Sequence, residues 1–262
     1  MLKAVSKDGT TLAYDQLGDG PAVLIVGGAF TDRRATRPLA DLLAADFTVL
    51  NYDRRGRGDS GDTAPFAVER EIEDIAALIE QAGGAAAVFA HSSGAALAIE
   101  AARALPGITQ LALYEPPFIV DDSRPPLPGD YVAHLQELTA AGKREEIVEY
   151  FMTVAVGLPA EFLAPMRDGE MWPHMIALAP TVAYDGAAVA ANMMGRPLPS
   201  EWSGEITVPT LVLDGENSPA WQRDSVQALV NLLPDAQRHS LPGADHGAPP
   251  EQLAPVLTAF LR

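Results

Sequence analysis

Short runs of consecutive apolar residues alternate along most of this chain with longer segments in which apolar residues recur at every third or fourth position. A continuous apolar run is typical of a strand buried on both faces, and the wider spacing is typical of a helix with one buried face. The predicted strands are 2–6, 11–16, 22–26, 48–52, 86–90, 109–114, 210–213 and 236–241. The predicted helices are 35–45, 67–82, 92–105, 219–233 and 251–262. This alternation predicts an α/β fold with a mostly parallel, doubly wound sheet.

Residues 120–200 interrupt the alternation with a Pro-rich stretch followed by helices. The predicted helices lie near 130–141, 144–156, 160–167 and 171–193, and the last is divided or kinked by Pro173 and Pro180. Six of the seven methionines of the chain lie in this segment, together with Phe151, Phe162 and Trp172.

Methionine and aromatic side chains suit a pliable apolar pocket. We therefore expect residues 120–200 to form a helical lid, inserted between the sixth and seventh strands of a core made of 1–119 and 201–262. Met152 and Trp172 are the lid residues that we expect to bind substrate. A helical bundle with a plain apolar core is the alternative explanation of the same pattern.

Composition narrows the class of protein. The hydrophobic content of 48% allows a substantial core, and a formal net charge of −17 opposes binding to nucleic acid or to anionic membrane surfaces. The chain has no cysteine, which excludes disulfides and thiolate metal sites. The first residues lack the apolar core of a signal peptide, and no apolar run approaches the roughly 20 residues that span a bilayer. We expect a cytoplasmic protein that acts on a small molecule, with its oligomeric state left open.

The predicted strand 86–90 ends abruptly in a serine-rich turn, and an Ala-rich helix follows it. A serine in a sharp strand-to-helix turn is exposed as a nucleophile, and the strained turn needs small residues two positions before and two positions after it. Ala90 and Gly94 meet this demand around Ser92, whereas a bulky histidine stands two positions before Ser93. We interpret Ser92 as the candidate nucleophile. Taken alone, the motif would also fit an ordinary helix N-cap.

Five ordered motifs resemble those of the α/β-hydrolase superfamily, and the resemblance covers nearly the full length of the chain. They are Gly27-Gly28-Ala29-Phe30, Asp53-Arg54-Arg55-Gly56-Arg57-Gly58-Asp59-Ser60, Ala90-His91-Ser92-Ser93-Gly94, Val208-Pro209-Thr210-Leu211-Val212-Leu213-Asp214-Gly215 and Gly243-Ala244-Asp245-His246-Gly247. The resemblance implies the α/β-hydrolase fold, and it implies that His246 is the general base that a serine nucleophile needs. His91 stands beside the nucleophile but should project away from it.

The carboxylate that should orient the histidine is displaced. The family's usual acid position, three residues after the glycine that ends the seventh strand, holds Ser218. Glu115 follows the sixth strand, at the carboxyl edge where catalytic groups gather, and Pro116 is expected to hold it in an extended conformation. The placement is similar to that in haloalkane dehalogenases whose acid follows strand six. We expect Glu115 to be the acid; Asp214, Glu216 or no acid at all are the alternatives.

The backbone N–H groups of Ser93 and Ala29 are the expected oxyanion hole, and Phe30 is expected to contact substrate. The basic cluster after the fourth strand is interpreted as a structural brace rather than an anion site; it comprises Arg54, Arg55 and Arg57. The motifs therefore predict a cofactor-free and metal-free serine hydrolase of esterase or lipase type, acting on carboxylic esters through an acyl-enzyme. A lyase or thioesterase with the same groups is one alternative. A ligand-binding or signalling homologue with little catalysis is the other.

Overall fold

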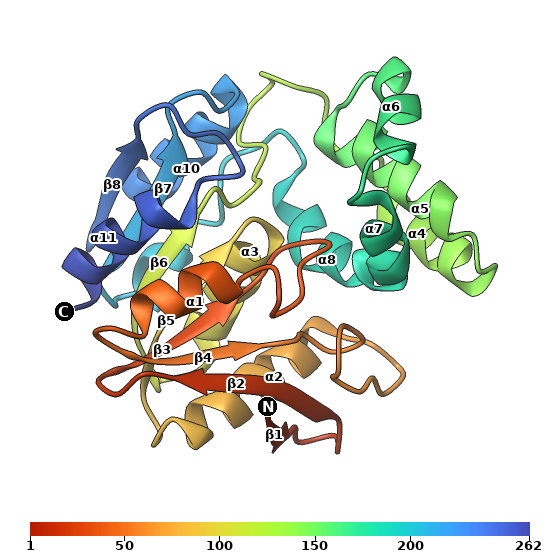
Figure 1. Cartoon of the computed structure of the whole chain (residues 1–262). Coiled ribbons are helices and arrows are strands. Elements are labelled where there is room, and N and C mark those ends of the chain that lie inside the picture. The colour runs from red at the N-terminus through yellow and green to blue at the C-terminus, as the bar shows by residue number, and fades with distance from the viewer.

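The computed structural model describes all 262 residues, which form a central sheet of eight strands with helices on both faces and a helical lobe at one side (Figure 1). The strands are β1 (Leu2–Val5), β2 (Thr11–Leu17), β3 (Ala22–Val26), β4 (Thr48–Tyr52), β5 (Ala86–His91), β6 (Ile108–Tyr114), β7 (Thr210–Gly215) and β8 (Ala236–Leu241). Their order across the sheet is β1-β2-β4-β3-β5-β6-β7-β8, and β2 alone runs opposite to the others. The predicted mostly parallel α/β sheet is confirmed, with strand ends within a residue or two of the prediction.

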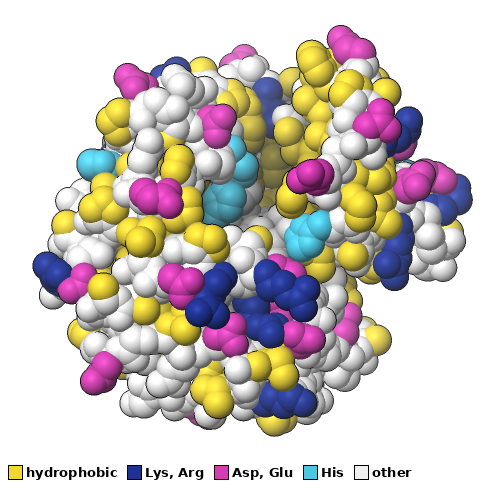
Figure 2. Space-filling view, in the orientation of Figure 1, with side chains coloured by type: hydrophobic (Ala, Val, Ile, Leu, Met, Phe, Trp, Pro, Cys, Tyr) yellow, Lys and Arg dark blue, Asp and Glu magenta, His cyan; other side chains and the backbone are white.

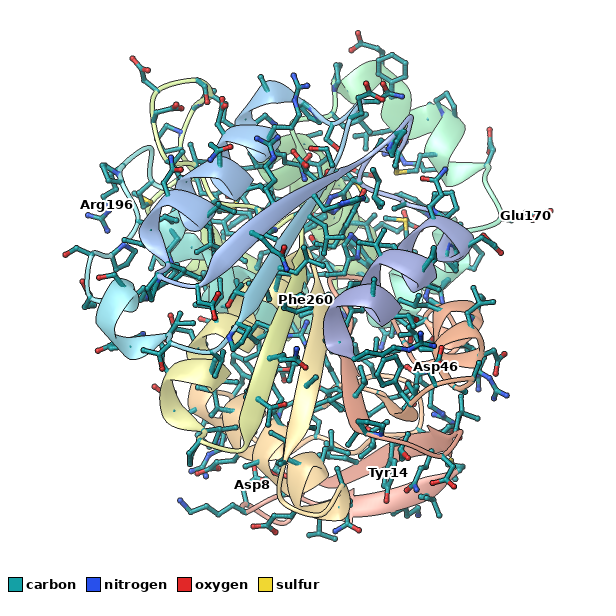
Figure 3. The ribbon with its side chains drawn as sticks, turned by 90° about the vertical axis from the view of Figure 1, so that its left-hand side faces the viewer. Asp8, Tyr14, Asp46, Glu170, Arg196 and Phe260 are labelled. Carbon is teal, nitrogen blue, oxygen red and sulfur yellow. The ribbon has the colours of Figure 1, made fainter.

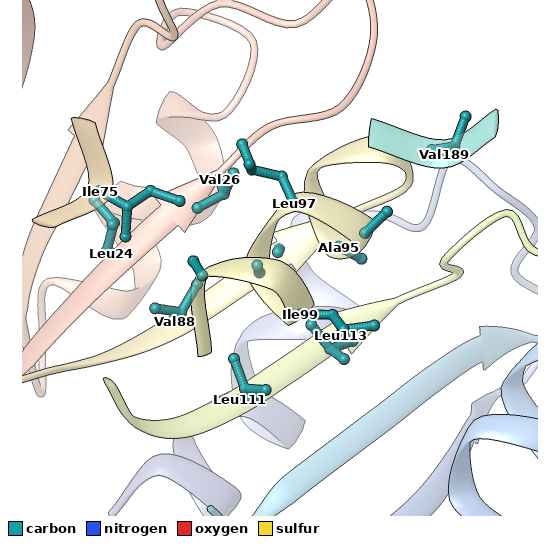
Figure 4. Packing of buried hydrophobic residues seen from close by; sticks show 14 of the residues in the cluster. Leu24, Val26, Ile75, Val88, Ala95, Leu97, Ile99, Leu111, Leu113 and Val189 are labelled. Atoms are coloured by element: carbon teal, nitrogen blue, oxygen red, sulfur yellow. The ribbon is translucent and has the colours of Figure 1, made fainter. Parts of the chain in front are cut away.

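The central strands fill two separate hydrophobic cores, one on each face of the sheet. In β3, Leu24 and Val26 belong to the larger core, whereas Val23 and Ile25 belong to the smaller one. Successive side chains of a strand point to opposite faces, so a strand covered on both sides must be apolar at every position. Figure 4 shows part of the larger core, where the strands meet α3 (Ser93–Ala104) through residues that include Val88, Leu111, Leu113, Ala95, Leu97 and Ile99.

Helices cover both faces as expected. Over the smaller core, α1 (Arg37–Leu43) packs against α11 (Pro250–Leu261), while α2 (Val68–Gln81), α3 and α10 (Ala220–Leu232) cover the larger core. Strand β8 forms one edge of the sheet, between α10 and α11, and this edge faces the viewer in Figure 3. None of the helices has the length and apolar character required to cross a membrane.

Between β6 and β7 the chain leaves the sheet and forms the predicted helical insertion, which we call the insertion (residues 120–200). Its helices are α4 (Tyr131–Ala140), α5 (Arg144–Tyr150), α6 (Leu163–Arg167), α7 (Trp172–Leu178) and α8 (Val182–Val189), and the short α9 (Trp202–Glu205) follows it. The single helix predicted over 144–156 is instead α5 followed by a π-helical turn, Phe151–Val156. Pro180 lies in the tight turn between α7 and α8, as expected. Helix α8 packs against both α3 and α4, so it joins the insertion to the core.

Candidate active site

Ser92 stands in the turn between β5 and α3, and its backbone is strained. Its φ of 57° and ψ of −126° are values that residues other than glycine rarely adopt. Gly94 explains the demand for a small residue two positions later, because a Cβ there would lie 2.6 Å from the carbonyl oxygens of Val26 and Gly27. The turn brings Ser92 to the carboxyl edge of the parallel strands, where it lines a cavity.

The side chains of Ser92, His246 and Glu115 form a continuous series of polar contacts. His246 Nε2 lies 3.1 Å from Ser92 Oγ, and His246 Nδ1 lies 2.6 Å from Glu115 Oε2. A carboxylate only accepts hydrogen bonds, so the proton sits on Nδ1 and Nε2 is free to accept the proton of Ser92. The Gln222 carboxamide nitrogen also lies 2.9 Å from Nδ1, but the shorter, charged contact with Glu115 takes the single proton. A histidine held in this way can act as a general base toward a serine.

Glu115 is fully buried at the end of β6, and its carboxylate is held by three donors. Oε1 accepts hydrogen bonds from the Gly215 backbone N–H, at 2.8 Å, and from the Ser218 hydroxyl, while Oε2 faces His246. Ser218 occupies the position where the family usually has its acid. In this chain that position supplies a donor that supports the displaced carboxylate.

Neither alternative carboxylate reaches His246. Asp214, still inside β7, pairs with Arg238 on the neighbouring strand. Glu216 accepts a hydrogen bond from the backbone N–H of Gly243, at 3.0 Å. Of the three carboxylates considered from the sequence, only Glu115 contacts the imidazole.

The backbone of Glu115 differs from the extended conformation expected before Pro116, because its φ is +49°. The three hydrogen bonds to the carboxylate override the local preference. Only two other residues besides the glycines have a positive φ, Phe30 at 55° and Ser92 at 57°. Such conformations persist where surrounding contacts over-determine them, and they cluster at functional sites. All three lie at this one site, which marks it independently of any motif.

Two backbone N–H groups beside Ser92 have no partner within the chain. Ser93 is the first residue of α3, where a helix offers its N–H no acceptor, and Ala29 lies in the loop after β3 and its N–H donates to no other group. The loop approaches Ser92 closely because residue 28 is glycine; a Cβ on Gly28 would lie 2.9 Å from the Ser92 Cβ. Both Ser93 and Ala29 line the cavity with Ser92.

The arginines of the basic cluster are buried and paired, so none is free to bind an anion. Arg54 donates to the Gly27 carbonyl at 3.1 Å, and Arg57 donates to the Gly28 carbonyl at 2.5 Å, so both hold the loop that carries Ala29. Arg55 pairs instead with carboxylates near the start of the chain and on α2, Asp8 and Asp74.

Asp185 on α8 is the residue of this cluster that sequence reasoning missed. Its carboxylate lies 2.6 Å from both Arg54 and Arg57 and accepts a hydrogen bond from the Ser93 hydroxyl at 2.8 Å. Burial alone would raise its pKa, but the two guanidinium groups outweigh burial and the pKa is lowered. A single aspartate in an Ala-rich helix carries no sequence signal, because its partners lie 92 to 131 residues away along the chain.

His91 does not contact the hydroxyl of Ser92. Its ring Nε2 lies 3.0 Å from the backbone carbonyl of His246, which can only accept, so Nε2 carries a proton. Burial, together with the charge of His246, lowers the pKa of His91 to about 3. His91 is therefore neutral at neutral pH, and it supports the loop that carries His246.

A cavity of about 490 Å³ opens in front of Ser92, between the core and the insertion. Figure 2 shows the hollow between the two lobes, with hydrophobic side chains on its walls and histidine beside it. Phe30 and Met152 line it, as predicted for substrate-binding residues, and Phe30 meets Phe151 edge to face at a ring distance of 5.1 Å. No lysine or arginine lines the cavity, and its carboxylates are Asp185 and Asp245.

The prediction that Trp172 lines the cavity is wrong. Trp172, at the start of α7, is buried among other apolar residues of the insertion and is 8% exposed. The tryptophan that does line the cavity is Trp221 on α10. Sequence spacing shows that a residue sits on a helix but not which neighbour the helix meets, so the two tryptophans could not be told apart. No group of three or more His, Asp or Glu side chains is arranged to hold a metal ion.

Comparison with known proteins shows the family to which this fold belongs. The model of the alpha/beta hydrolase family matches residues 22–259. An alpha/beta hydrolase from Sphaerobacter thermophilus is 49% identical, with a TM-score of 0.92 and complete coverage of both chains. A 2-(acetamidomethylene)succinate hydrolase from Mesorhizobium japonicum is 25% identical over 96% of this chain and 91% of that protein. Lipase LipV of Mycobacterium tuberculosis is 30% identical over 81% of each.

Proposed function

The chain belongs to the alpha/beta hydrolase family and is a hydrolase, and from this premise we propose that it is a serine esterase with Ser92 as nucleophile, His246 as base and Glu115 as acid. The observation that carries the proposal is the unbroken series of contacts from Glu115 through His246 to Ser92. This series places a nucleophile, a base and an acid in the order that acyl transfer requires. The intact series therefore favours catalysis over the ligand-binding alternative.

The first half of the reaction forms an acyl-enzyme. The Ser92 oxygen attacks the ester carbonyl carbon while His246 Nε2 takes the hydroxyl proton, and Glu115 stabilises the charged imidazole that results. The carbonyl oxygen becomes negative and accepts hydrogen bonds from the unpaired N–H groups of Ser93 and Ala29. The intermediate then collapses, the ester C–O bond breaks, and the imidazole returns the proton to the departing alcohol.

The second half repeats these steps with water. His246 takes a proton from a water molecule whose oxygen attacks the acyl carbon, and the same two N–H groups again stabilise the negative oxygen. The bond to Ser92 breaks as the imidazole returns the proton to its oxygen. The products are a free carboxylic acid and the resting enzyme.

The side chains that line the cavity favour an uncharged substrate with a largely apolar acyl or alcohol part. The Mesorhizobium relative is named for a succinate substrate, but recognition of a dicarboxylate calls for cationic groups, and no lysine or arginine lines this cavity. The lipase relative is the better guide to the substrate class. The cavity volume of about 490 Å³ is that of a site for a small molecule.

A fluorophosphonate probe tests the nucleophile, and p-nitrophenyl esters of graded chain length test the reaction. We expect the probe to label the wild-type protein and Ser93→Ala but not Ser92→Ala. Steady turnover of the esters should likewise disappear in Ser92→Ala, with its melting temperature unchanged. Labelling that survives in Ser92→Ala would overturn the assignment of the nucleophile, and labelling without turnover would favour the ligand-binding alternative.

A further inference from the structure

Tyr131, the first residue of α4, has its hydroxyl at the wall of the cavity and without a partner. The residue is 1% exposed and lines the cavity, yet its hydroxyl forms no hydrogen bond within the chain. The hydroxyl is not sealed off either, because the only fully enclosed side-chain polar atoms that lack a partner belong to Ser6, Tyr52 and Arg124. The small exposed part of Tyr131 therefore includes its hydroxyl, which faces the cavity.

The ring of Tyr131 is held firmly in this position. It stacks on Tyr150 of α5 at a ring distance of 5.5 Å, and its edge rests on α8 at Gly186, where a Cβ would lie only 3.1 Å from Tyr131 Cε1. The neighbouring Asp185 accepts the hydrogen bond from the Ser93 hydroxyl. The wall that carries the Tyr131 ring is thus continuous with the turn that carries the nucleophile.

The hydroxyl is a permanent donor. Burial, together with the nearby charge of Asp185, raises the pKa of Tyr131, so the phenol keeps its proton in neutral solution. A purely alkyl chain laid over this hydroxyl would bury a donor without an acceptor, which costs free energy. An uncharged oxygen on the substrate would satisfy it. A carboxylate would instead lie near the negative charge of Asp245, with no lysine or arginine in the lining to neutralise it.

We propose that Tyr131 is a specificity-determining residue, whose hydroxyl donates a hydrogen bond to an uncharged oxygen, a ketone or an ether, carried by the part of the ester that fills the cavity. The preferred substrates are then oxygen-bearing esters rather than simple alkyl esters. This inference rests on the proposed function only for the statement that the substrate is an ester. Recognition of the oxygen depends on the cavity wall alone.

The test compares Tyr131→Phe with wild type on two matched pairs of esters. The acyl pair is p-nitrophenyl hexanoate against p-nitrophenyl 5-oxohexanoate, and the alcohol pair is pentyl acetate against 2-ethoxyethyl acetate. We expect Tyr131→Phe to lower kcat/KM about tenfold for the oxygen-bearing member of at least one pair. The alkyl members should change little or improve. The pair that responds identifies the part of the ester that carries the oxygen.

Tyr150→Phe is the matched control, because it removes a tyrosine hydroxyl from the other ring of the same stack and Tyr150 does not line the cavity. It should leave the ratio between the members of each pair unchanged. Equal melting temperatures of the two variants and wild type would show that the ring packing is intact. A change in kcat/KM by the same factor for alkyl and oxygen-bearing esters would overturn the proposal.

Binding to Ser92→Ala separates this inference from the proposed function. Trp221 lines the cavity and reports occupancy through its fluorescence, so dissociation constants for the same esters can be measured without turnover. If wild type hydrolyses none of the esters, the proposed function fails. The role of the Tyr131 hydroxyl is then tested by the dissociation constants alone. Weaker binding of the oxygen-bearing esters in Ser92→Ala/Tyr131→Phe supports its role, and unchanged binding overturns it.

Discussion

Replacing Glu115 by glutamine changes one atom in the series of contacts from Glu115 through His246 to Ser92, and it should remove most of the activity. The carboxylate oxygen Oε1 accepts from the Gly215 N–H and the Ser218 hydroxyl, so the amide oxygen of glutamine will take that position. Its NH₂ group must then face His246 Nδ1. Two donors cannot face each other, so His246 will carry its proton on Nε2 instead, where it cannot accept the proton of Ser92.

The size of the expected loss in kcat follows from this change of the His246 tautomer. In a serine protease triad the equivalent exchange of acid for amide lowers kcat about 10⁴-fold, which corresponds to about 5.4 kcal/mol in the activation barrier. The same loss is expected here because the contact from Glu115 Oε2 to His246 Nδ1 is short, at 2.6 Å, and the carboxylate is fully buried. The shape of the side chain is preserved, so the melting temperature should change little.

Initial rates with p-nitrophenyl butyrate measure kcat, with Glu216→Gln and Asp214→Asn as controls that should lose far less activity. Combined with Ser92→Ala, Glu115→Gln should add almost nothing, because the members of a triad act as one unit. A loss smaller than about tenfold in a fully folded Glu115→Gln would refute the tautomer argument. An equal loss in Glu216→Gln would contradict the assignment of Glu115 as the carboxylate that orients His246.

Three further predictions concern side chains of the site and of the insertion. Asp185→Asn removes the only carboxylate paired with Arg57, so the free energy of unfolding measured in urea should fall by about 3–5 kcal/mol. A fall below about 1 kcal/mol would contradict the ion pairing of Asp185 with the buried arginines. Burial and the neighbouring charge lower the pKa of His91 from 6.5 to about 3, so the unfolded chain binds more protons between these values and stability should fall as the pH drops through them. In His91→Gln the melting temperature should vary less over that range; an identical pH profile would exclude His91 as the cause. Met152→Gln should raise KM for hexanoate esters with little change in melting temperature, whereas Trp172→Ala should cost about 3–5 kcal/mol of stability; the reverse result would mean that the cavity wall is assigned wrongly.

The core of the fold was predictable from local pattern because each buried strand is apolar at every position. Residues 22–26 and 48–52 were predicted with the boundaries that β3 and β4 have in the structure. Ser92 was likewise a local inference, since the strained turn needs small residues at fixed positions in the chain. Gly94 shows the physical basis of that need, because a Cβ there would collide with the carbonyl oxygens of Val26 and Gly27.

The insertion was harder to interpret because its helices pack on both the core and one another. The spacing of apolar residues shows which side of a helix is buried but not what covers it. Trp172 and Trp221 both sit near the start of a helix, and only the packing of α7 and α10 decides that the second one lines the cavity. Tyr131 and Asp185 were missed for the same reason.

The sequence by itself determined the sheet, its helices, the position of the insertion and the strained turn at Ser92, because all of these depend on residues that are neighbours along the chain. Tertiary structure alone decided which carboxylate meets His246. Glu115 is 131 residues away from it, and its unusual backbone conformation is maintained by donors from β7 and from the loop that follows it. Tertiary structure also decided that Asp185 would hold the loop beside the nucleophile and that Tyr131 would face the cavity. The contacts of Asp185 form only when the insertion docks on the core, and no local spacing in the sequence shows where a distant partner will lie.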